Sequence, residues 1–573
     1  MVHKTLDTDI LILGSGGAGL FAALHAHKAN PDLSITVAVK GLLGKCGCTR
    51  MVQGGYNVAL AKEDSVERHF MDTIEGGKWL PDQDLAWKLV TLAIERIKEL
   101  ENELGCFFDR NPDGTVHQKA FAGQTFDRTV HKGDLTGIEI INRLAEQVWA
   151  RKINRLEEFR AIELIKDRSG AGIAGVLFID MRTGEYVLVR AKAVLLATGG
   201  GPTMYKYHTP SGDKTCDGLA MALRAGLALR DMEMVQFHPT GLLAGTHTRM
   251  TGTVLEEGLR GAGGYLLNGA KERFMPKYDP KAERATRDFV SRAMYTEMRK
   301  GNVTPNGGLY IAMSHLGPER VARDFKGMVE RCADCGFDLA GGLVEVVPTA
   351  HYLMGGVEFS PDCRTALSGL FVAGEDAGGV HGANRLGGNG VANSTVYGAV
   401  AGDVMAEWVK GRDLADPDAA QVEKGILEAE RPFKAKAGLL EPLREKLYET
   451  MWQKVGIIRD DAGLRSALSE LDSLESEIQN TGVADGNRAF NLTWHDWLNL
   501  KSLLQTSRAI ATAALARTDS RGAHFREDYP EPGPLESSAF TSLTLEGAEL
   551  RISTKAVAFT RVRPGQTLLK TVA

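Results

Sequence analysis

The sequence predicts an α/β protein in which a discontinuous parallel sheet carries an inserted α+β domain and is followed by a C-terminal helical domain. Three observations support this prediction. Apolar runs that end in glycine recur at residues 9–13, 192–201 and 369–379, as in buried parallel strands. Mixed, charged sequence separates the last two runs. Helical periodicity then begins near residue 417.

Length and composition set further limits. The chain has 573 residues, 43% of them hydrophobic, which predicts two to four domains. A formal net charge of -5 gives no basic excess for nucleic acid or an acidic membrane surface. No run approaches the ~20 apolar residues of a membrane span, so we expect no direct membrane insertion. The seven cysteines lack the spacing of a disulfide scaffold, which favours a reducing, cytoplasmic location, with any membrane association through a partner protein.

The domain prediction follows these changes along the chain. Residues 1–244 and 346–416 are expected to form two parts of one nucleotide-binding domain. Residues 245–345 are expected to form a mobile capping domain between them. Residues 417–530 form the predicted helical domain, and alternation within the tail, 531–573, predicts a short β-hairpin.

The glycine-rich segment GSGGAG follows the first apolar run directly and opens a helix of small residues. In a Rossmann-like domain Gly14 permits the tight turn, Gly16 lets backbone approach a diphosphate, and Gly19 allows helix and strand to pack closely. The helix N-terminus then attracts the anion. A glycine-rich turn that binds nothing is the alternative, which the flanking strand and helix disfavour. About twenty residues on, Val39 and Lys40 stand where an acid would bind an NAD ribose, and this weakens an NAD assignment more than a flavin one.

Ordered motifs continue along the chain. They are QGG (53–55), ATGG (197–200), DMEMVQFHPTG (231–241), EEGLRGAGGYL (256–266), TRDFVSR (286–292), PTAHYLMGG (348–356), GEDAGGVHGANRLGGN (374–389) and TDSRGAHFREDYP (518–530). With these motifs the sequence resembles the flavoprotein subunits of the succinate dehydrogenase and fumarate reductase family, whose relatives include L-aspartate oxidase. The resemblance implies a Rossmann-like FAD-binding domain, FAD as cofactor, and hydride exchange between flavin N5 and a carbon of a small carboxylate.

The resemblance also implies a carboxylate-binding site. His238, His351 and Arg385 match the family's substrate-binding positions, where two imidazoles and a guanidinium offer donors to an anion. Considered without the family, a lone histidine in FHPTG is as often a structural residue as a ligand.

Arg287 matches the residue that delivers a proton to the substrate carbon in this family. Because arginine stays protonated in proteins, it can donate only if a relay reprotonates it, and Glu257 and Arg260 match that relay. Without the resemblance, Arg287 followed by Asp288 is more typical of a surface ion pair or a helix start.

The implied FAD contacts are spread over both parts of the nucleotide-binding domain. They are Gly14, Gly16, Gly17, Gly19, Lys40, Cys48, Thr49, Gln53, Gly54, Gly55, Ala197, Thr198, Gly199, Asp217, Glu375, Arg385, Gly388 and Asn389. Glu375 resembles the acid that holds ribityl or ribose hydroxyls, and a loop carboxylate in solvent is the alternative. No metal site is predicted, because the CxxC of Cys332 and Cys335 lacks companions.

Two positions depart from the family's pattern. Cys48 stands where a histidine bonds covalently to the flavin in the respiratory enzymes. Either the FAD is not tethered or the thiolate forms a thioether, and the first is favoured because cysteine is commonly a small buried apolar residue. Glu256 stands where a threonine or serine donates to a substrate carboxylate. An ionised Glu256 would repel a dianionic substrate, unless it turns away or pairs with a nearby arginine.

Three functions remain open at this stage. A reductase or dehydrogenase of an unsaturated or saturated carboxylate comes first, and an oxidase resembling L-aspartate oxidase comes second, with Glu256 facing an ammonium. A non-catalytic electron relay is disfavoured because His238, Arg287, His351 and Arg385 occur together. The chain has no cysteine cluster for an iron-sulfur centre, so electrons must pass to or from another molecule. The partner that the resemblance implies is an iron-sulfur subunit.

Overall fold

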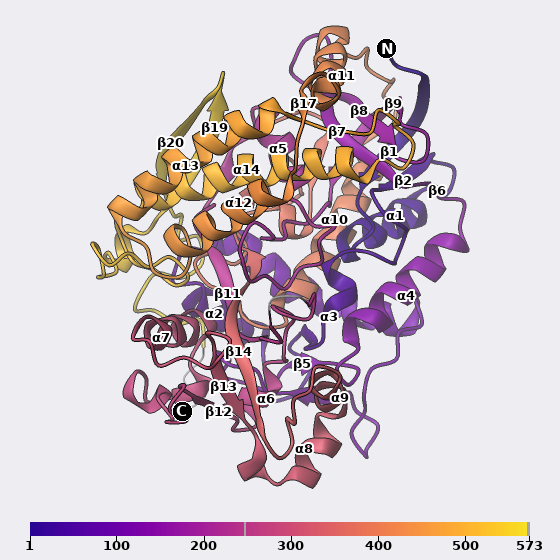
Figure 1. The fold of residues 1–573 in the computed structure, drawn as a ribbon. Coiled ribbons are helices and arrows are strands. Elements are labelled where there is room, and N and C mark those ends of the chain that lie inside the picture. Colours follow the sequence, from indigo (N-terminus) through magenta and orange to yellow (C-terminus); the bar gives the residue numbers. More distant parts are fainter. Residues whose placement is uncertain (246–247, 570–573) are drawn as a thin grey trace.

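A computed structural model describes residues 1–245 and 248–569 (Figure 1). Its largest sheet has seven strands in the order β6-β2-β1-β9-β8-β7, with β16 paired to β9. The parallel strands are β1 (Lys4–Leu13), β2 (Ile35–Val39), β6 (Asn154–Glu157), β9 (Glu185–Leu196) and β16 (Leu370–Val372). β7 (Phe159–Lys166) and β8 (Ile173–Asp180) extend the sheet in antiparallel fashion. The predicted discontinuous sheet is confirmed, because β16 pairs with β9 although the whole cap lies between them in sequence.

Two long helices pack against one another beside this sheet. α1 (Gly17–Ala29) follows β1, and α10 (Asn389–Trp408) follows β16 and packs against α1. Small residues make the close crossing possible, since a Cβ on Gly398 would lie 2.5 Å from the Ala18 carbonyl oxygen and one on Gly402 would lie 2.4 Å from that of Ala22. Both helices begin near the carboxyl ends of parallel strands, where ligands of open α/β sheets bind.

The remaining helices and short strands of the nucleotide-binding region surround this pair. α3 packs on α10, α4 packs on α1, and three short strands form a separate small sheet. These elements are α2 (Val66–Gly76), α3 (Gln83–Asn102), α4 (Thr136–Trp149), α5 (Asp217–Arg224), β3 (Tyr56–Asn57), β4 (Gln118–Lys119) and β5 (Thr129–Val130).

The inserted region is a four-stranded antiparallel sheet with helices. The strand order is β11-β14-β13-β12, and the region has a hydrophobic core of its own. Its elements are β11 (Val235–Leu242), β12 (Tyr265–Leu267), β13 (Leu309–Ala312), β14 (Leu343–Leu353), α6 (Gly258–Gly261), α7 (Arg287–Arg299), α8 (Pro318–Asp324) and α9 (Lys326–Asp334). The predicted domain limit between residues 345 and 346 falls inside β14. Two strands, β11 and β14, thus run from the nucleotide-binding region into the cap.

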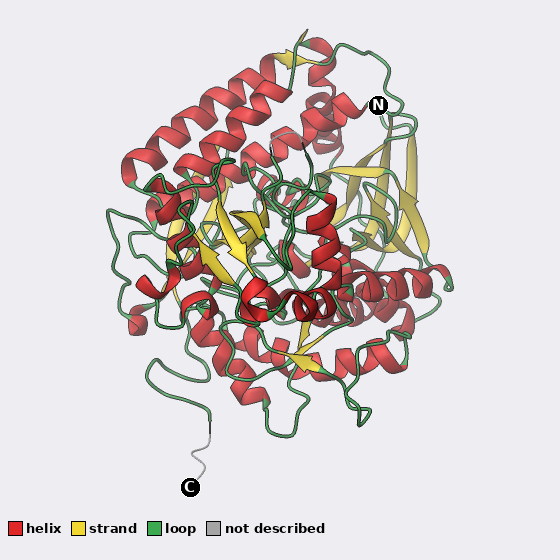
Figure 2. Cartoon of the chain, turned by 60° about the horizontal axis from the view of Figure 1, so that its bottom comes forward, coloured by secondary structure: helices red, strands yellow, loops and turns green. Residues whose placement is uncertain are grey.

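Four helices follow at the opposite end of the molecule from α8 and α9 (Figure 1). They are α11 (Ala419–Lys434), α12 (Glu441–Lys454), α13 (Asp461–Asn480) and α14 (Leu492–Ala516), with the short strands β17 (Lys436–Ala437) and β18 (Thr481–Gly482) between them. Figure 2 shows α12–α14 as a layer of long helices separate from the large sheet. In the described residues, no helix combines the length and the apolar character that crossing a bilayer requires.

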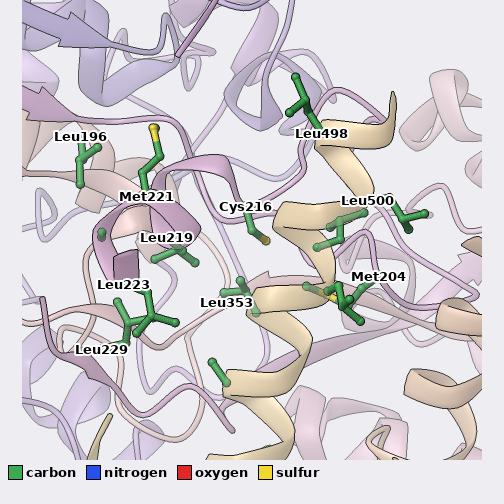
Figure 3. Close-up of a cluster of buried hydrophobic side chains, with 14 of the residues drawn as sticks. Leu196, Met204, Cys216, Leu219, Met221, Leu223, Leu229, Leu353, Leu498 and Leu500 are labelled. Atoms are coloured by element: carbon green, nitrogen blue, oxygen red, sulfur yellow. The ribbon is translucent and has the colours of Figure 1, made fainter. Parts of the chain in front are cut away.

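The interface between α14 and α5 is apolar and includes a cysteine at a glycine-like position. Cys216 is fully buried there, with Leu219 and Leu500 nearby (Figure 3). Its φ of 56° lies in the left-handed region that favours glycine. We therefore interpret Cys216 as a packing residue.

The tail forms an antiparallel hairpin of β19 (Ala539–Glu546) and β20 (Glu549–Ala556). This hairpin is not isolated, because β19 pairs with β10 (Leu229–Arg230), which pairs with β15 (Gly356–Val357). Beyond it, the Val562 carbonyl accepts a hydrogen bond from Gln83 Nε2 at 2.7 Å, so the tail returns to the start of α3.

Candidate active site

Two adjoining cavities open at the carboxyl ends of β1 and β9. The smaller, of about 60 Å³, contains the predicted cofactor residues Gly14, Gly16, Lys40, Thr198, Gly199 and Asp217. The larger, of about 540 Å³, is lined by the predicted residues Gly16, Gly17, Cys48, Thr49, Gln53, Gly54, Gly55, Ala197, Gly199, His238, Glu257, Arg287, His351, Glu375, Arg385 and Gly388. Gly19, Arg260 and Asn389 line neither cavity. The two cavities share Gly16, Gly199 and Lys214, so together they form one elongated site.

The glycine-rich segment has the close contacts that its spacing predicts. Gly14 has φ 111°, and a Cβ there would lie 2.1 Å from the carbonyl oxygen of Ala197, the residue that follows β9. A Cβ on Gly19 would lie 1.9 Å from the Gly14 carbonyl oxygen. Only glycine fits at either position, and the backbone of the turn before α1 is thereby left open to the smaller cavity.

Lys40 and Asp217 form an ion pair in the smaller cavity. Lys40 Nζ donates to Asp217 Oδ2 at 2.9 Å, and Arg160 Nη2 donates to Oδ1 at 2.9 Å. Burial alone would raise the pKa of Asp217, but Arg160 and Lys40 hold it well below the ordinary value. Asp217 is therefore ionised and already paired with two cations. Arg160, which the sequence analysis did not identify, belongs to this cluster.

Lys214 is a second residue that the sequence analysis missed. It lines both cavities, and its Nζ donates to the Thr198 carbonyl oxygen at 2.8 Å. Among the described residues, no carboxylate oxygen lies within 4.0 Å of this ammonium group. Lys214 lines the region where the two cavities meet, together with Gly16, which is the N-cap of α1. Its signal in the sequence was only a lysine in a loop before a helix.

Glu375 and Asn389 differ in what their side chains do. Glu375 lines the larger cavity, and its Oε1 accepts backbone N–H bonds from Gly201 at 3.1 Å and Leu353 at 3.0 Å. Asn389 points away from the cavity, because its Oδ1 accepts hydrogen bonds from Asn57 at 2.8 Å and bonds to His69 at 3.0 Å. The side chain of Asn389, at the start of α10, is therefore held in a buried hydrogen-bond network outside both cavities.

Two arginines that line the larger cavity share a hydrogen-bond acceptor, the side chain of Gln236. Gln236 Oε1 accepts from Arg287 Nη1 at 3.0 Å and from Arg385 Nη2 at 3.1 Å. Gln236 is fully buried on β11, two residues before His238 and therefore on the same side of that strand in regular β-structure. The sequence analysis missed it, although the alternation of β-strand side chains would have indicated it. Arg385 also stacks over the Tyr352 ring at 4.4 Å.

Glu257 joins Arg287 to Arg260. Arg287 Nη2 and Nε donate to Glu257 Oε2 at 2.6 and 3.0 Å, and Arg260 Nη2 donates to Oε1 at 3.3 Å. Burial would raise the pKa of Glu257, but Arg287 and Arg260 keep it below the ordinary value. Arg287 is thus not on the surface, and the predicted relay residues form one connected, buried chain.

The two histidines lie side by side, with ring centroids 5.3 Å apart. The Thr240 N–H donates to His238 Nδ1 at 3.3 Å, so Nε2 is the nitrogen that carries the proton. Burial, reinforced by nearby arginines, lowers the pKa of both His238 and His351 well below the ordinary range. Both imidazoles are neutral donors, and the positive charge of this site comes from Arg287 and Arg385. Burial lowers the pKa of Arg385 only to about 10.

Glu256 lines the larger cavity and pairs with a lysine. Its Oε2 accepts from Lys119 Nζ at 3.2 Å, and its side chain is only 7% exposed. Burial raises the pKa of Glu256, whereas Lys119 opposes this shift. Glu256 neither pairs with an arginine nor turns away from the cavity, so both of these expected alternatives are wrong. The partner is Lys119, and the carboxylate remains at the cavity wall.

Cys48 also lines the larger cavity, at the start of a short 3-10 helix (Cys48–Met51). Burial raises the pKa of its thiol, which disfavours the thiolate. Cys332 and Cys335 are free, and the described residues contain no group of His, Cys, Asp or Glu arranged to hold a metal ion.

Two family models match the chain. The model described as FAD binding domain matches residues 9–391, and the model described as Fumarate reductase flavoprotein C-term matches residues 444–568. One subunit of the CoM/CoB fumarate reductase of Methanothermobacter marburgensis is 40% identical over 543 residues, covering 93% of this chain and 96% of that protein. The chain belongs to the succinate dehydrogenase and fumarate reductase flavoprotein family.

Other members of the family agree over nearly the whole chain. The fumarate reductase flavoprotein subunit of Escherichia coli is 34% identical over 548 residues, covering 92% of this chain and 89% of that protein. A mutant of the E. coli quinol fumarate reductase FrdA has a TM-score of 0.92 at 32% identity, covering 98% of this chain and 99% of the other. Mycobacterium smegmatis Sdh1 in complex with UQ1 has a TM-score of 0.85 at 36% identity, covering 96% and 94%.

These matches confirm the recognised family, the fold class and FAD as cofactor. The chain is an FAD-dependent oxidoreductase of the fumarate reductase and succinate dehydrogenase type. The relatives from M. marburgensis and E. coli are both named as subunits of larger enzymes.

Proposed function

We propose that the larger cavity is where a small carboxylate or dicarboxylate exchanges a hydride with FAD at a carbon-carbon bond. The observation that carries this proposal is the arrangement of Arg287. It lines the cavity, is held by Gln236 and Glu257, and lies beside Arg385. This arrangement combines an anion-binding group with a fixed N–H donor at the same cavity.

The residues present fit FAD along the elongated site. Gly14 and Gly16 line the smaller cavity at the N-terminus of α1, and Lys214 adds a cation where the cavities meet. Lys214 and the α1 N-terminus would hold the diphosphate, whereas Glu375 would accept from cofactor hydroxyls. Bound FAD would supply the two-electron chemistry by hydride exchange at N5. We propose that the FAD is not covalently held, since Cys48 carries a protonated thiol.

The side chains of this chain would then perform three tasks. His238, His351 and Arg385 bind a substrate carboxylate and polarise the adjoining carbon-carbon bond. Arg287 donates a proton to one carbon of that bond when hydride reaches its neighbour, and accepts it in the reverse direction. In reduction Glu257 would pass a proton from Arg260 to the deprotonated Arg287, and in oxidation it would pass the proton from Arg287 towards Arg260. The cap excludes water, since it contributes Glu257 and Arg287 to the cavity.

The electron partner is proposed to be an iron-sulfur subunit, which would also mediate any membrane association. This proposal is supported by the names of the relatives, which are subunits of larger enzymes. An oxidase like L-aspartate oxidase is the second candidate. The carboxylate of Glu256 at the cavity wall supports it, because it could face a substrate ammonium.

A reoxidation screen tests the proposal. The FAD-loaded protein would be reduced anaerobically and mixed with unsaturated mono-, di- and tricarboxylates. The flavin absorbance would then be followed. We expect rapid reoxidation by at least one compound, and no reoxidation by the saturated counterparts. The proposal fails if no carboxylate reoxidises the flavin faster than buffer, and rapid reoxidation by oxygen with L-aspartate as electron donor would favour the second candidate.

A further inference from the structure

One wall of the larger cavity is a short segment, residues 254–257, that several distant residues contact. The Val254 carbonyl oxygen accepts from Arg331 Nη1 at 3.0 Å and from Gln53 Nε2 at 3.2 Å. At the other end of the segment, Glu257 accepts from Arg287. Three residues of chain span at most about 10 Å. Arg331 and Arg287 thus contact opposite ends of one short segment, and both line the larger cavity.

Arg331 reaches this wall from the cap helix α9 and lines the cavity. Its Nη1 is the only guanidinium nitrogen with a hydrogen bond to the described residues, and no described carboxylate lies within 4.0 Å. The Nε and Nη2 donors are therefore available. These two nitrogens form the fork that engages a carboxylate with two parallel hydrogen bonds.

Glu256 lies close to Val254 in sequence, so its carboxylate would be the natural partner of Arg331. That carboxylate is instead paired with Lys119. The Lys119 ammonium is 3.2 Å from Glu256 Oε2 and its side chain is 20% exposed, so the pair is mostly withdrawn from water. Lys119 thus neutralises the carboxylate that would otherwise compete for Arg331. The charge of Arg331 also lowers the pKa of Glu256, but among the described residues Arg331 forms no ion pair within 4.0 Å.

We propose that Arg331 binds a second carboxylate of the substrate, in place of the hydroxyl donor that the family has at position 256. In this scheme one substrate carboxylate lies at His238, His351 and Arg385 and the other lies at Arg331. Lys119 is a positioning residue in this scheme, because it keeps Glu256 from capturing Arg331. The inference rests on the proposed function of the larger cavity.

Binding of non-reacting probes tests the inference without turnover. Malonate and glutarate, together with their monoamides malonamate and glutaramate, would be titrated into the oxidised holoenzyme while the flavin absorbance is recorded. We expect the parent to bind at least one dicarboxylate more tightly than its monoamide. Arg331→Leu should weaken that dicarboxylate by about tenfold to a hundredfold, the loss typical of a charge-assisted contact, and the monoamide by less than about threefold.

Two further variants separate a specific role from a general one. Lys326→Met removes a cation from the exposed start of the same helix and should change neither affinity. Lys119→Met should weaken binding of the dicarboxylate, because Glu256 is then free to form an ion pair with Arg331. Adding Glu256→Gln to this variant should restore binding.

The outcomes are distinguishable. The inference is overturned if the parent does not prefer a dicarboxylate, or if Arg331→Leu weakens acid and monoamide equally. In either case a parent that still binds monoamides through Arg385 retains the proposed function. If no probe perturbs the flavin of the parent, the proposed carboxylate site and the role of Arg331 both fail.

Discussion

Replacement of Arg287 by lysine tests the proposed proton donor most directly. The change keeps a positive charge at the site but replaces a planar fork with a single ammonium. Arg287 makes three side-chain hydrogen bonds, at 2.6 and 3.0 Å to Glu257 and at 3.0 Å to Gln236. A lysine at this position can keep about one of them. The variant should therefore retain its fold and its FAD while losing the fixed position of the donor.

The magnitude follows from the lost contacts. Hydrogen bonds to charged groups contribute about 1.5–3 kcal/mol each, so losing two removes roughly 3–6 kcal/mol of positioning. A correctly placed general acid contributes about 10²- to 10⁴-fold to rate. We expect the rate of hydride transfer in Arg287→Lys to fall by at least about 100-fold, while binding of a carboxylate probe at Arg385 changes much less.

The assay is stopped-flow reoxidation of the reduced, FAD-loaded protein by its best carboxylate acceptor, with FAD content measured in parallel. Arg284→Lys is the matched control, because Arg284 is exposed and, among the described residues, its side chain donates only to the Gly261 carbonyl oxygen. A rate for Arg287→Lys within about tenfold of the parent would show that Arg287 is not the acid. A variant that has lost its FAD would instead identify Arg287 as a structural residue.

Three other predictions concern the cofactor and the cavity wall. Acid precipitation should release the FAD into the supernatant, because the Cys48 thiol is protonated, and flavin fluorescence that stays with the polypeptide would contradict this. Lys214→Met should weaken FAD binding to the apoprotein by about tenfold to a hundredfold, measured by fluorescence quenching, with the exposed Lys45→Met unchanged. Glu256→Thr should raise kcat/KM for dicarboxylates by up to about tenfold, roughly a third of the ~4 kcal/mol between unit charges ~4 Å apart at intermediate dielectric. Because burial raises the pKa of Glu256, the parent carboxyl becomes neutral as pH falls, so this gain should shrink towards low pH, and a pH-independent gain would refute an electrostatic origin.

The fold was predictable because its main signals are periodic and local. Apolar runs ending in glycine marked β1 and β9, and the spacing of Gly14 and Gly19 reflects contacts to backbone atoms that any side chain would block. For strands far apart in sequence, we could predict that they belong to one sheet but not which strands pair with each other. The contact of the tail hairpin with β10 carried no such signal, since two-residue strands have no recognisable pattern.

Site residues could be predicted where they belong to a motif. The contacts that their side chains make could not be predicted. Arg287 and Glu257 come from motifs, and the structure places them in contact. Asn389 also comes from a motif, but its amide is used by Asn57 and His69 in a buried network. A sequence position near a cofactor therefore does not establish that the side chain reaches it.

The cavity wall shows why substrate preference could not be inferred from one substituted position. Considered alone, Glu256 predicts repulsion of a second carboxylate. A buried carboxylate is costly unless it is paired, so the same fold that accepts Glu256 must supply a cation, and it does so with Lys119 from a different part of the chain. That pairing leaves Arg331 without an ion pair within 4.0 Å in the described structure, although its charge also lowers the pKa of Glu256. The electrostatic effect of Glu256 on a substrate therefore depends on two residues far from it in sequence, and its sign follows from the three charges together.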